Sequence, residues 1–352
     1  MDRFAIDPSS APTVDAHRRV APALILSRQH IASLMSLPDY VAAVEVAFRA
    51  HGTGHAETPV PAHIGVQQGT FHIKSASLVL DRPYVAVKLN GNFPGNPARN
   101  AMPTIQGVVA LCDGNDGTVL AVMDSIEITL RRTAAATVLA ARYLAQPSSD
   151  TVGLCGCGAQ GRAQLEALAA CLPLRRVLVW DVDEPKARRF ANDMSRSLAV
   201  EVDAVDSAKE VTVESHVVVT ATTARRPFVT DDMVRPGAFV AAIGADNPGK
   251  SELAPALLAG AKVVVDLMDQ AATMGDLHHA IAAGAMTREH VHAELSDVVL
   301  GRKVGRKSNQ ERIVFDSTGT AVQDVATAVA IWKRAAAKGV GATIDFGALH
   351  SA

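Results

Sequence analysis

The chain has 352 residues, of which 48% are hydrophobic and 20% are charged, as is typical of an α/β protein large enough for two domains. The formal net charge is −2 and the basic residues are scattered, so no basic patch points to nucleic acid or an anionic membrane. No apolar stretch reaches the ~20 residues of a membrane span, and no signal peptide is recognisable. We therefore expect a cytoplasmic protein whose partners are small molecules or a second copy of the chain.

The first part of the chain combines a helical pattern with strand patterns. Residues 1–20 are polar, contain proline and lack periodicity, so we expect a loose arm there. Residues 37–50 place apolar side chains at helical spacing. Short β-rich runs bounded by Gly, Pro and Asn then predict a sheet, with strands at residues 70–75, 84–89 and 107–111.

An alanine-rich helix is predicted at residues 128–144, followed by a linker at residues 146–149. Beyond the linker the sequence alternates between strands and helices, and the helix at 160–170 is the first of these. The predicted strands are residues 151–155, 176–181, 216–220, 238–243 and 261–266. This order favours a doubly wound parallel sheet covered on both faces.

These patterns predict an α/β protein with two domains. One is a Rossmann-type domain of residues 149–319, and the other is an α+β domain of residues 1–148 and 320–352. The helix predicted at residues 321–338 is expected to return to the first domain.

The sequence G-x-G-x-x-G occurs at Gly156, Gly158 and Gly161, between a predicted strand and a predicted helix. The three glycines permit a tight turn, a close approach of the backbone to a pyrophosphate, and close packing of the helix on the strand. The helix N-terminus offers unpaired N–H groups to the phosphates. The motif in this context predicts a dinucleotide site.

Asp181 follows the second predicted strand, twenty residues after Gly161. A carboxylate at this position accepts hydrogen bonds from the ribose hydroxyls of NAD and repels the 2′-phosphate of NADP. The sequence therefore favours NAD, although Lys186 and Arg188 lie close enough in the chain to weaken that preference.

No metal site is expected. The four cysteines, Cys112, Cys155, Cys157 and Cys171, lack a ligand spacing. The four histidines in the stretch 278–292 lack i, i+4 pairs and a flanking acid, so a surface or interface position is favoured for them.

Several strings together make the chain resemble the ornithine cyclodeaminase/mu-crystallin family, from about residue 59 to residue 330. They are VKLNGNFP (87–94), MPTIQG (102–107), ITLRRTAA (128–135), GCGAQ (156–160), IGADNPGKSEL (243–253) and VFDSTGTAVQD (314–324). The resemblance implies a sheet in the N-terminal half that binds substrate and pairs two subunits, so it implies a homodimer with its site between the domains. It also implies oxidation of an amino acid at its α-carbon, or reduction of the imine.

The resemblance also implies residue assignments. Lys88 matches the lysine that touches the substrate carboxylate, and Asp246 the acid that handles the proton at the reacting carbon. Arg132 and Thr104 match residues that contact both cofactor and substrate. The remaining dinucleotide and nicotinamide contacts implied are Ala159, Gln160, Asp181, Thr220, Val240, Ala241, Ala242, Ile243, Lys250, Ser317 and Thr318.

Physical arguments support three of these assignments. Lys88 is predicted at the end of an apolar strand, where an ammonium can serve a carboxylate. Asp246 follows a strand's carboxyl end, where ligands gather in open α/β sheets, and it can accept a proton if burial raises its pKa. Arg132 is predicted near a helix start, where a cation usually answers an anion.

Two departures from the family pattern limit what the resemblance implies about substrate. Pro61 stands where an arginine usually clamps the carboxylate, and Lys74, in place of a pocket methionine, is the strongest candidate to replace it. His72 stands where ornithine-specific members carry a glutamate for the distal amine. Selectivity for a diamino acid therefore loses its main electrostatic basis.

Three functions remain open at this point. The first is an NAD-dependent amino-acid dehydrogenase or imine reductase. The second is an ornithine cyclodeaminase, which recycles NAD within one turnover and releases ammonia. The third is a non-catalytic binding protein like mu-crystallin, which the retention of Lys88 and Asp246 disfavours.

Overall fold

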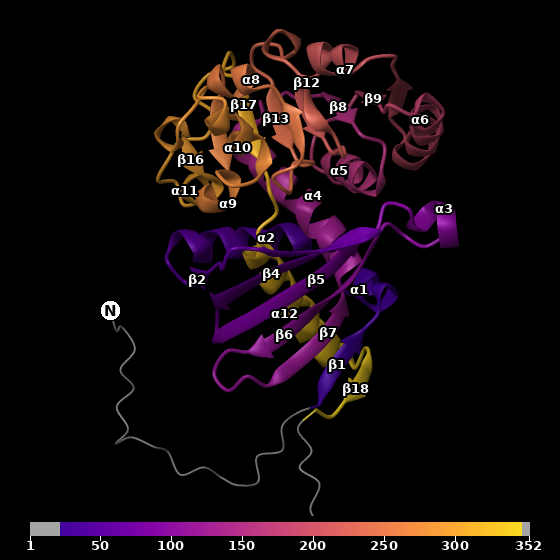
Figure 1. Cartoon of the computed structure of the whole chain (residues 1–352), viewed down its shortest axis with the longest axis vertical. Coiled ribbons are helices and arrows are strands. Elements are labelled where there is room, and N and C mark those ends of the chain that lie inside the picture. The colour runs from indigo at the N-terminus through magenta and orange to yellow at the C-terminus, as the bar shows by residue number, and fades with distance from the viewer. Residues whose placement is uncertain (1–21, 347–352) are drawn as a thin grey trace, which may run out of the picture.

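The computed structural model describes residues 22–346, so the predicted arm at residues 1–20 lies outside the described part. Two sheets lie one above the other, each with its own helices (Figure 1). The long helices α4 (Ser125–Leu144) and α12 (Ala321–Lys338) lie where the chain passes between the sheets. Both helices begin near the space between the two sheets.

The lower sheet in Figure 1 has eight strands, in the order β18-β1-β7-β6-β5-β4-β2, with β3 also paired to β4. The β1–β7 pair is parallel and the other pairs are antiparallel. The strands are β1 (Ala23–Leu26), β2 (Ala56–Glu57), β3 (Ala62–Val66), β4 (Gly69–Val79), β5 (Pro83–Asn92), β6 (Ile105–Asp113), β7 (Val119–Asp124) and β18 (Ala342–Ile344).

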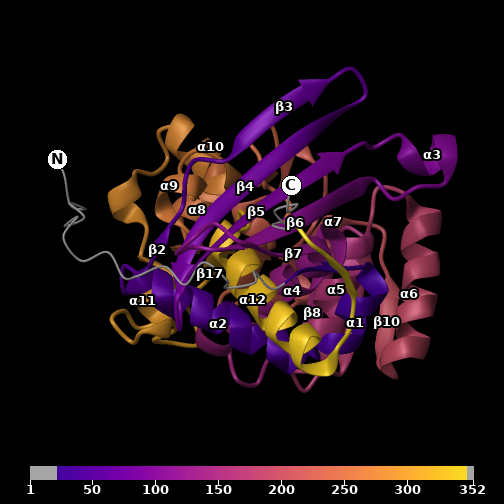
Figure 2. The same ribbon diagram turned by 90° about the horizontal axis from the view of Figure 1, so that it is seen from below.

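The inner face of this sheet divides into an apolar half and a polar half. At one end of β4 and β5, Leu78, Tyr84 and Ala86 are buried against α12, which crosses the sheet (Figure 2). Toward the other end, Lys74 and Lys88 lie opposite each other on β4 and β5. The helices on this side are α1 (Arg28–Leu34), α2 (Leu37–Gly52), α4 and α12, and α3 (Asn96–Asn100) lies in the β5–β6 connection.

The upper sheet has eight parallel strands in the order β10-β9-β8-β11-β13-β17-β15-β16. The order reverses between β8 and β11, and ligands bind at such a switch point in open α/β sheets. The strands are β8 (Thr151–Cys155), β9 (Arg176–Trp180), β10 (Glu201–Ala204), β11 (Val217–Thr220), β13 (Phe239–Ala242), β15 (Lys262–Val265), β16 (Ala293–Glu294) and β17 (Ile313–Asp316).

Helices cover both faces of the upper sheet, and a small parallel pair, β12 (Arg225–Val229) with β14 (Ser251–Leu253), lies beside it. The helices are α5 (Ala159–Ala169), α6 (Glu184–Leu198), α7 (Ala208–Glu214), α8 (Pro255–Ala259), α9 (Met268–Ala271), α10 (Gly275–Ala282) and α11 (Leu295–Val299). Short 3₁₀ turns occur at Asp231–Met233 and Arg288–His290. The predicted fold class is confirmed.

The predicted element bounds fit the upper sheet better than the lower one. The bounds of β8 and α12 are as predicted, and α12 returns to the first domain. The strand β5 continues to Asn92, so Lys88 lies within the strand and not at its end. The helix α4 begins at Ser125, where the Asp124 side chain caps it, so Arg132 is well inside the helix and the helix-start argument for it does not apply.

Within residues 22–346, no single helix has the length and apolar composition needed to cross a membrane. The bent pair α1 and α2 meets that test only when the two helices are taken together.

Candidate active site

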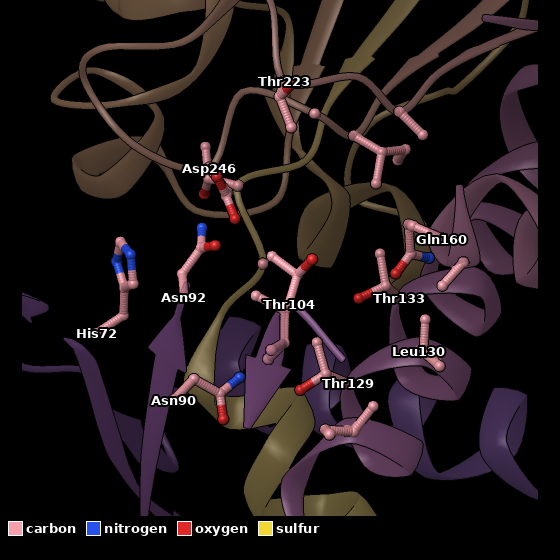
Figure 3. Close-up of a pocket in the computed structure, with 18 of the residues that line it drawn as sticks. His72, Asn90, Asn92, Thr104, Thr129, Leu130, Thr133, Gln160, Thr223 and Asp246 are labelled. Atoms are coloured by element: carbon pink, nitrogen blue, oxygen red, sulfur yellow. The ribbon is translucent and has the colours of Figure 1, made fainter. Parts of the chain in front are cut away.

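A cavity of about 480 Å³ lies between the two sheets. It is lined from below by β4, β5, the segment before β6, and α4, and from above by the glycine turn and by the ends of β11, β13 and β17 (Figure 3). The lining residues are His72, Lys74, Lys88, Asn90, Asn92, Pro103, Thr104, Ile105, Ile126, Thr129, Leu130, Arg132, Thr133, Ala159, Gln160, Ala221, Thr222, Thr223, Ile243, Gly244, Asp246, Lys250, Ser317, Thr318 and Gly319.

The glycine turn joins β8 to α5 at the edge of this cavity. Gly156 has a φ of +107°, which favours glycine. A Cβ on Gly161 would lie 2.1 Å from the Gly156 carbonyl oxygen, so only glycine lets the helix approach the strand this closely. A Cβ on Gly158 would meet open space. That space, at the N-terminus of an eleven-residue helix, fits a dinucleotide phosphate.

Asp181 lies just after β9, beside the glycine turn and outside the cavity lining. Its carboxylate accepts hydrogen bonds from the backbone N–H of Cys157 (2.9 Å) and of Asp183 (3.1 Å), and from Lys186 Nζ (2.6 Å). Burial opposes ionisation, but these donors together lower the pKa of Asp181. The Asp181 carboxylate is therefore ionised, and Lys186 is already paired with it.

Apart from the three glycines of the turn and Asp181, the predicted cofactor residues divide into two groups. Ala159, Gln160, Ile243, Lys250, Ser317, Thr318, Arg132 and Thr104 line the cavity. The side chains of Thr220, Val240, Ala241 and Ala242 lie beneath it, buried within β11 and β13. Side chains along a central parallel strand point into the two helix layers, and only the strand end faces the cleft. Thr222 and Thr223, which the sequence did not point to, line the cavity instead of Thr220.

A buried carboxylate, also missed from the sequence, supports these strand ends. Glu252 accepts hydrogen bonds from Thr220 Oγ1 (2.7 Å), the Thr222 N–H (2.6 Å) and the Gly244 N–H (2.9 Å). Burial, with Asp276 nearby, raises the pKa of Glu252 to about 7. Glu252 thus ties the end of β11 to the loop that carries Asp246.

The lower wall carries a cluster of cations around one carboxylate. Asp324, on the first turn of α12, accepts hydrogen bonds from Lys88 Nζ (2.6 Å) and Arg132 Nε (3.0 Å). All three side chains are buried. Burial lowers the pKa of Lys88 to about 7, with Arg132 and Lys74 adding to the effect and Asp324 opposing it. Asp324 was not singled out from the sequence, although it ends the quoted string VFDSTGTAVQD.

Lys74 differs from Lys88 in its partners. Its Nζ donates to the backbone carbonyls of Thr318 (3.0 Å) and Gly319 (2.8 Å), and the residue is only 8% exposed. Within residues 22–346, no carboxylate lies at ion-pairing distance from it. Lys74 is therefore a buried amine without an ion-pair partner, and burial lowers its pKa, with Asp246 opposing that shift from a longer distance. Pro61 is absent from the cavity lining.

Asp246 lies on the upper wall, across the cavity from the cation cluster. Its side chain is 51% exposed and its Oδ1 lies 2.7 Å from Lys250 Nζ. Burial by the surrounding cavity opposes ionisation, but Lys250 and Lys74 outweigh it and lower the pKa of Asp246. The expectation that burial raises this pKa is wrong here, because two lysines face the carboxylate.

The far wall carries polar side chains from the sheet. His72 and Asn90 are opposite each other on β4 and β5, one step beyond the two lysines, and all four face the cavity. His72 Nδ1 lies 2.8 Å from Nδ1 of His63 on the edge strand β3. Burial is the main cause that lowers the pKa of His72.

Among residues 22–346, the other histidines and the cysteine side chains are absent from the cavity lining. His278 and His279 contact each other, and His279 and His292 bond to backbone carbonyls. The four cysteines are free thiols, and burial raises the pKa of Cys157 to about 12. In the part of the chain that the structure describes, no three His, Cys, Asp or Glu side chains form a group suited to a metal ion.

Comparison with known proteins identifies the family. The model of the ornithine cyclodeaminase/mu-crystallin family matches residues 22–339. The alanine dehydrogenase of Archaeoglobus fulgidus is 37% identical over 92% of this chain and 98% of its own. The iminosuccinate reductase of Paracoccus denitrificans is 31% identical over 92% of this chain and 99% of its own.

Solved structures of similar proteins have the same overall fold. An archaeal alanine dehydrogenase dimer with bound NAD superimposes with a TM-score of 0.87 at 37% identity, over 92% of this chain and 99% of that one. The Δ1-pyrroline-2-carboxylate reductase of Thermococcus litoralis, in complex with NADH and L-proline, gives a TM-score of 0.86 at 32% identity. That match covers 91% of this chain and 100% of the other.

Proposed function

This chain belongs to the ornithine cyclodeaminase/mu-crystallin family, and we propose that it is an NAD-dependent oxidoreductase acting at the α-carbon of an amino acid or its imine. The observation that carries the proposal is the juxtaposition in one cavity of a dinucleotide turn, a buried cation cluster and, across from it, Asp246. NAD-linked relatives that act on amino or imino acids support it.

The cation cluster would hold the substrate carboxylate. Lys88 and Arg132 share a single anion, Asp324, so the group carries one positive charge in excess when all three are ionised. Each of the two cations keeps N–H groups that Asp324 does not use. A carboxylate bound here would leave the α-carbon between the cation wall and the glycine turn.

Asp246 would hold the nitrogen. Because its pKa is lowered, it is ionised at neutral pH and can accept a hydrogen bond from an ammonium or iminium group. In reduction, NADH bound at the glycine turn would supply the hydride for the imine carbon, and solvent would supply the proton that completes the amine. The ends of β11, β13 and β17 would enclose the reacting carbon.

We assign a different function to the domain around each sheet. We propose that residues 1–148 and 320–352 bind substrate and form the dimer, and that residues 149–319 bind NAD. The outer face of the lower sheet is apolar and lies on the side away from α12, with Ile25, Ile64, Val87, Leu89 and Val108 all exposed (Figure 1). Such a face is normally covered by a partner, and we propose that the partner is a second copy of the chain.

A test of the dimer uses two charged substitutions on this face. Leu89→Asp with Val108→Lys places charges in the middle of the apolar surface, so sedimentation equilibrium is expected to change from dimer to monomer. The exposed residue Val182 lies far from this face in the fold, and Val182→Lys serves as the control. A wild-type chain that sediments as a monomer would contradict the proposal.

The ornithine cyclodeaminase alternative is less well supported by the cavity. A distal ammonium would meet His72 and Asn90 on the far wall, and neither is anionic. The carrier alternative has less support, because the similar proteins named above are dehydrogenases and reductases.

The experiment that tests the function is a screen of 2-oxo acids with ammonium or methylamine, and of cyclic imines, monitored by NADH absorbance at several pH values. We expect NADH oxidation that depends on the amine. Ornithine with NAD is expected to give little or no proline. Brisk formation of proline would favour the cyclodeaminase, and binding of imino acids without turnover would favour the carrier.

A further inference from the structure

We propose that the substrate carries a second carboxylate on its side chain, so that the enzyme reduces dicarboxylic 2-imino acids or oxidises dicarboxylic amino acids. This inference rests on the proposed function. The second carboxylate would bind at a subsite formed by Lys74, His72 and Asn90 on the inner face of β4 and β5.

The charge of the cavity is the first observation. Four cations line it, namely Lys74, Lys88, Arg132 and Lys250. Among the described residues two carboxylates pair with them, Asp324 with Lys88 and Arg132, and Asp246 with Lys250. With all six groups ionised and His72 neutral, two positive charges remain. One α-carboxylate balances only one of them.

The place of the uncompensated charge is the second observation. The charge that the Lys88 cluster carries serves the α-carboxylate. The other charge belongs to Lys74, whose two hydrogen bonds go to the neutral carbonyl groups of Thr318 and Gly319. An ammonium has three N–H donors, so one donor remains for a ligand. Burial lowers the pKa of Lys74, and the more distant Asp246, Asp324 and Asp266 do not offset this, so an incoming carboxylate would favour the protonated form.

The neighbours of Lys74 on the sheet are the third observation. His72 lies two residues from Lys74 on the same face of β4, and its Nδ1 is engaged by His63. When His63 donates that hydrogen bond, His72 carries its proton on Nε2 and can donate to an anion while remaining neutral. The carboxylate that faces His72 and Lys74 across the cavity is Asp246, and it is paired with Lys250 at 2.7 Å.

Asn90 presents a donor on the same wall. Its Oδ1 accepts a hydrogen bond from Ser125 Oγ (2.5 Å), so its NH₂ group is the part left for a ligand. Figure 3 shows the amide nitrogen of Asn90 turned toward the Thr104 side of the cavity. Lys74, His72 and Asn90 together form a set of donors suited to a carboxylate and unsuited to an ammonium.

The alternative is that Lys74 holds the α-carboxylate together with Lys88, in place of the arginine missing at Pro61. The two arrangements predict different substrate dependence. If Lys74 binds a side-chain carboxylate, removing its charge affects only dicarboxylic substrates. If it binds the α-carboxylate, removing its charge lowers kcat/KM equally for all substrates.

The experiment compares substrates of equal carbon length. Oxaloacetate is matched with 2-oxobutyrate and 2-oxoglutarate with 2-oxovalerate, each with ammonium and NADH. Reactions without ammonium measure reduction of the ketone itself. The reverse reaction compares aspartate with 2-aminobutyrate and glutamate with norvaline. We expect kcat/KM for one dicarboxylic substrate to exceed that of its matched monocarboxylic partner by about tenfold or more.

Two variants locate the subsite. Lys74→Met and His72→Gln are each expected to lower kcat/KM for the dicarboxylic substrate by about tenfold, mainly through KM. We expect the value for the monocarboxylic partner to change by less than about threefold. Lys333→Met, which removes an exposed lysine of α12 from a surface ion pair, is the matched control and should change neither value. Retained activity on the monocarboxylic substrate shows that Lys74→Met folds, and His72→Gln tests the same subsite without removing a buried lysine.

Two results would overturn the inference. The first is a wild-type preference for monocarboxylic imines, and the second is an equal loss on both substrates in Lys74→Met. Turnover of some imine in either case leaves the proposed function standing. By contrast, no amine-dependent NADH oxidation with any substrate would reject the proposed function itself.

Discussion

The upper and lower walls of the cleft differ in the groups that they offer to a ligand. The upper wall offers backbone groups to the proposed dinucleotide, at a turn where a side chain on residue 156 or 161 would clash with the backbone. The lower wall offers the proposed substrate three charged side chains, Lys74, Lys88 and Arg132, that are buried from water.

The consequence concerns how each wall tolerates change. A backbone site depends on local geometry, which the strand, turn and helix fix together. A buried charged site depends on exact compensation, because each ion that loses its partner is left in a medium that solvates it poorly. We therefore expect substitutions on the lower wall to have larger effects than substitutions near the dinucleotide.

The largest effect is expected for Asp324→Asn. This change leaves Lys88 and Arg132 as two buried cations without an anion, so the free energy of unfolding is expected to fall by about 3–5 kcal/mol. Urea denaturation followed by circular dichroism measures it. Asp246→Asn is the matched control, because Asp246 is partly exposed and pairs only with Lys250, and its cost is expected to stay below about 1 kcal/mol. Equal stability of the two variants would show that the cluster is not held by Asp324.

The second prediction separates binding from catalysis on the upper wall. Asp246→Asn keeps the size of the side chain but removes the charge that we propose holds the substrate nitrogen. We expect kcat to fall by about 10²-fold or more, with NAD affinity nearly unchanged. Steady-state kinetics and cofactor titration measure the two quantities. A fall below about tenfold would mean that another group handles the nitrogen.

The difference between the walls also explains what could be predicted from sequence. The glycine turn, β8 and Asp181 are specified within about thirty residues, so a local motif reveals them. The lower wall depends on pairs that lie far apart in the chain, such as Lys88 with Asp324, which are 236 residues apart. No spacing rule connects them, and the family resemblance supplied Lys88 but gave Asp324 no function.

The end of β5 and the pKa of Asp246 were also predicted wrongly, because both depend on contacts between distant parts of the chain. The strand β5 runs past Lys88 because its alternation continues through Asn90 and Asn92, polar residues that usually mark turns but here face the cavity. The low pKa of Asp246 depends on Lys250 and Lys74, and the distance of a carboxylate from a lysine on another sheet cannot be read from a sequence.

A pH profile sharpens the comparison. The pKa of Lys88 is lowered to about 7, so the group is protonated below that pH and neutral above it. If its charge holds the substrate carboxylate, kcat/KM for imine reduction falls as pH rises through about 7. Lys88→Arg keeps the charge to much higher pH, so its profile should lose this fall even if its overall rate is lower. Both enzymes are measured with the same imine, so the titration of the imine itself affects both profiles equally. Identical profiles would exclude Lys88 as the titrating group.

The smallest effect is expected at the dinucleotide, for Asp181→Ala. The change removes the carboxylate that we propose binds the ribose. It also frees Lys186, which in the wild type pairs with Asp181 at 2.6 Å. NAD should bind about tenfold more weakly, the size of one charged hydrogen bond, and NADP should bind better because Lys186 becomes available to its 2′-phosphate. The backbone turn stays intact, so binding is weakened and not lost.

Fluorescence titration with both cofactors measures these affinities, since Trp180 is adjacent to Asp181. Lys186→Met in the wild-type background is the control, and it should keep the preference for NAD because the carboxylate remains. In the double variant the gain in NADP affinity should disappear, which would identify Lys186 as its source. A wild-type preference for NADP would contradict the assignment of Asp181, because an ionised carboxylate in contact with the ribose cannot favour a phosphate there.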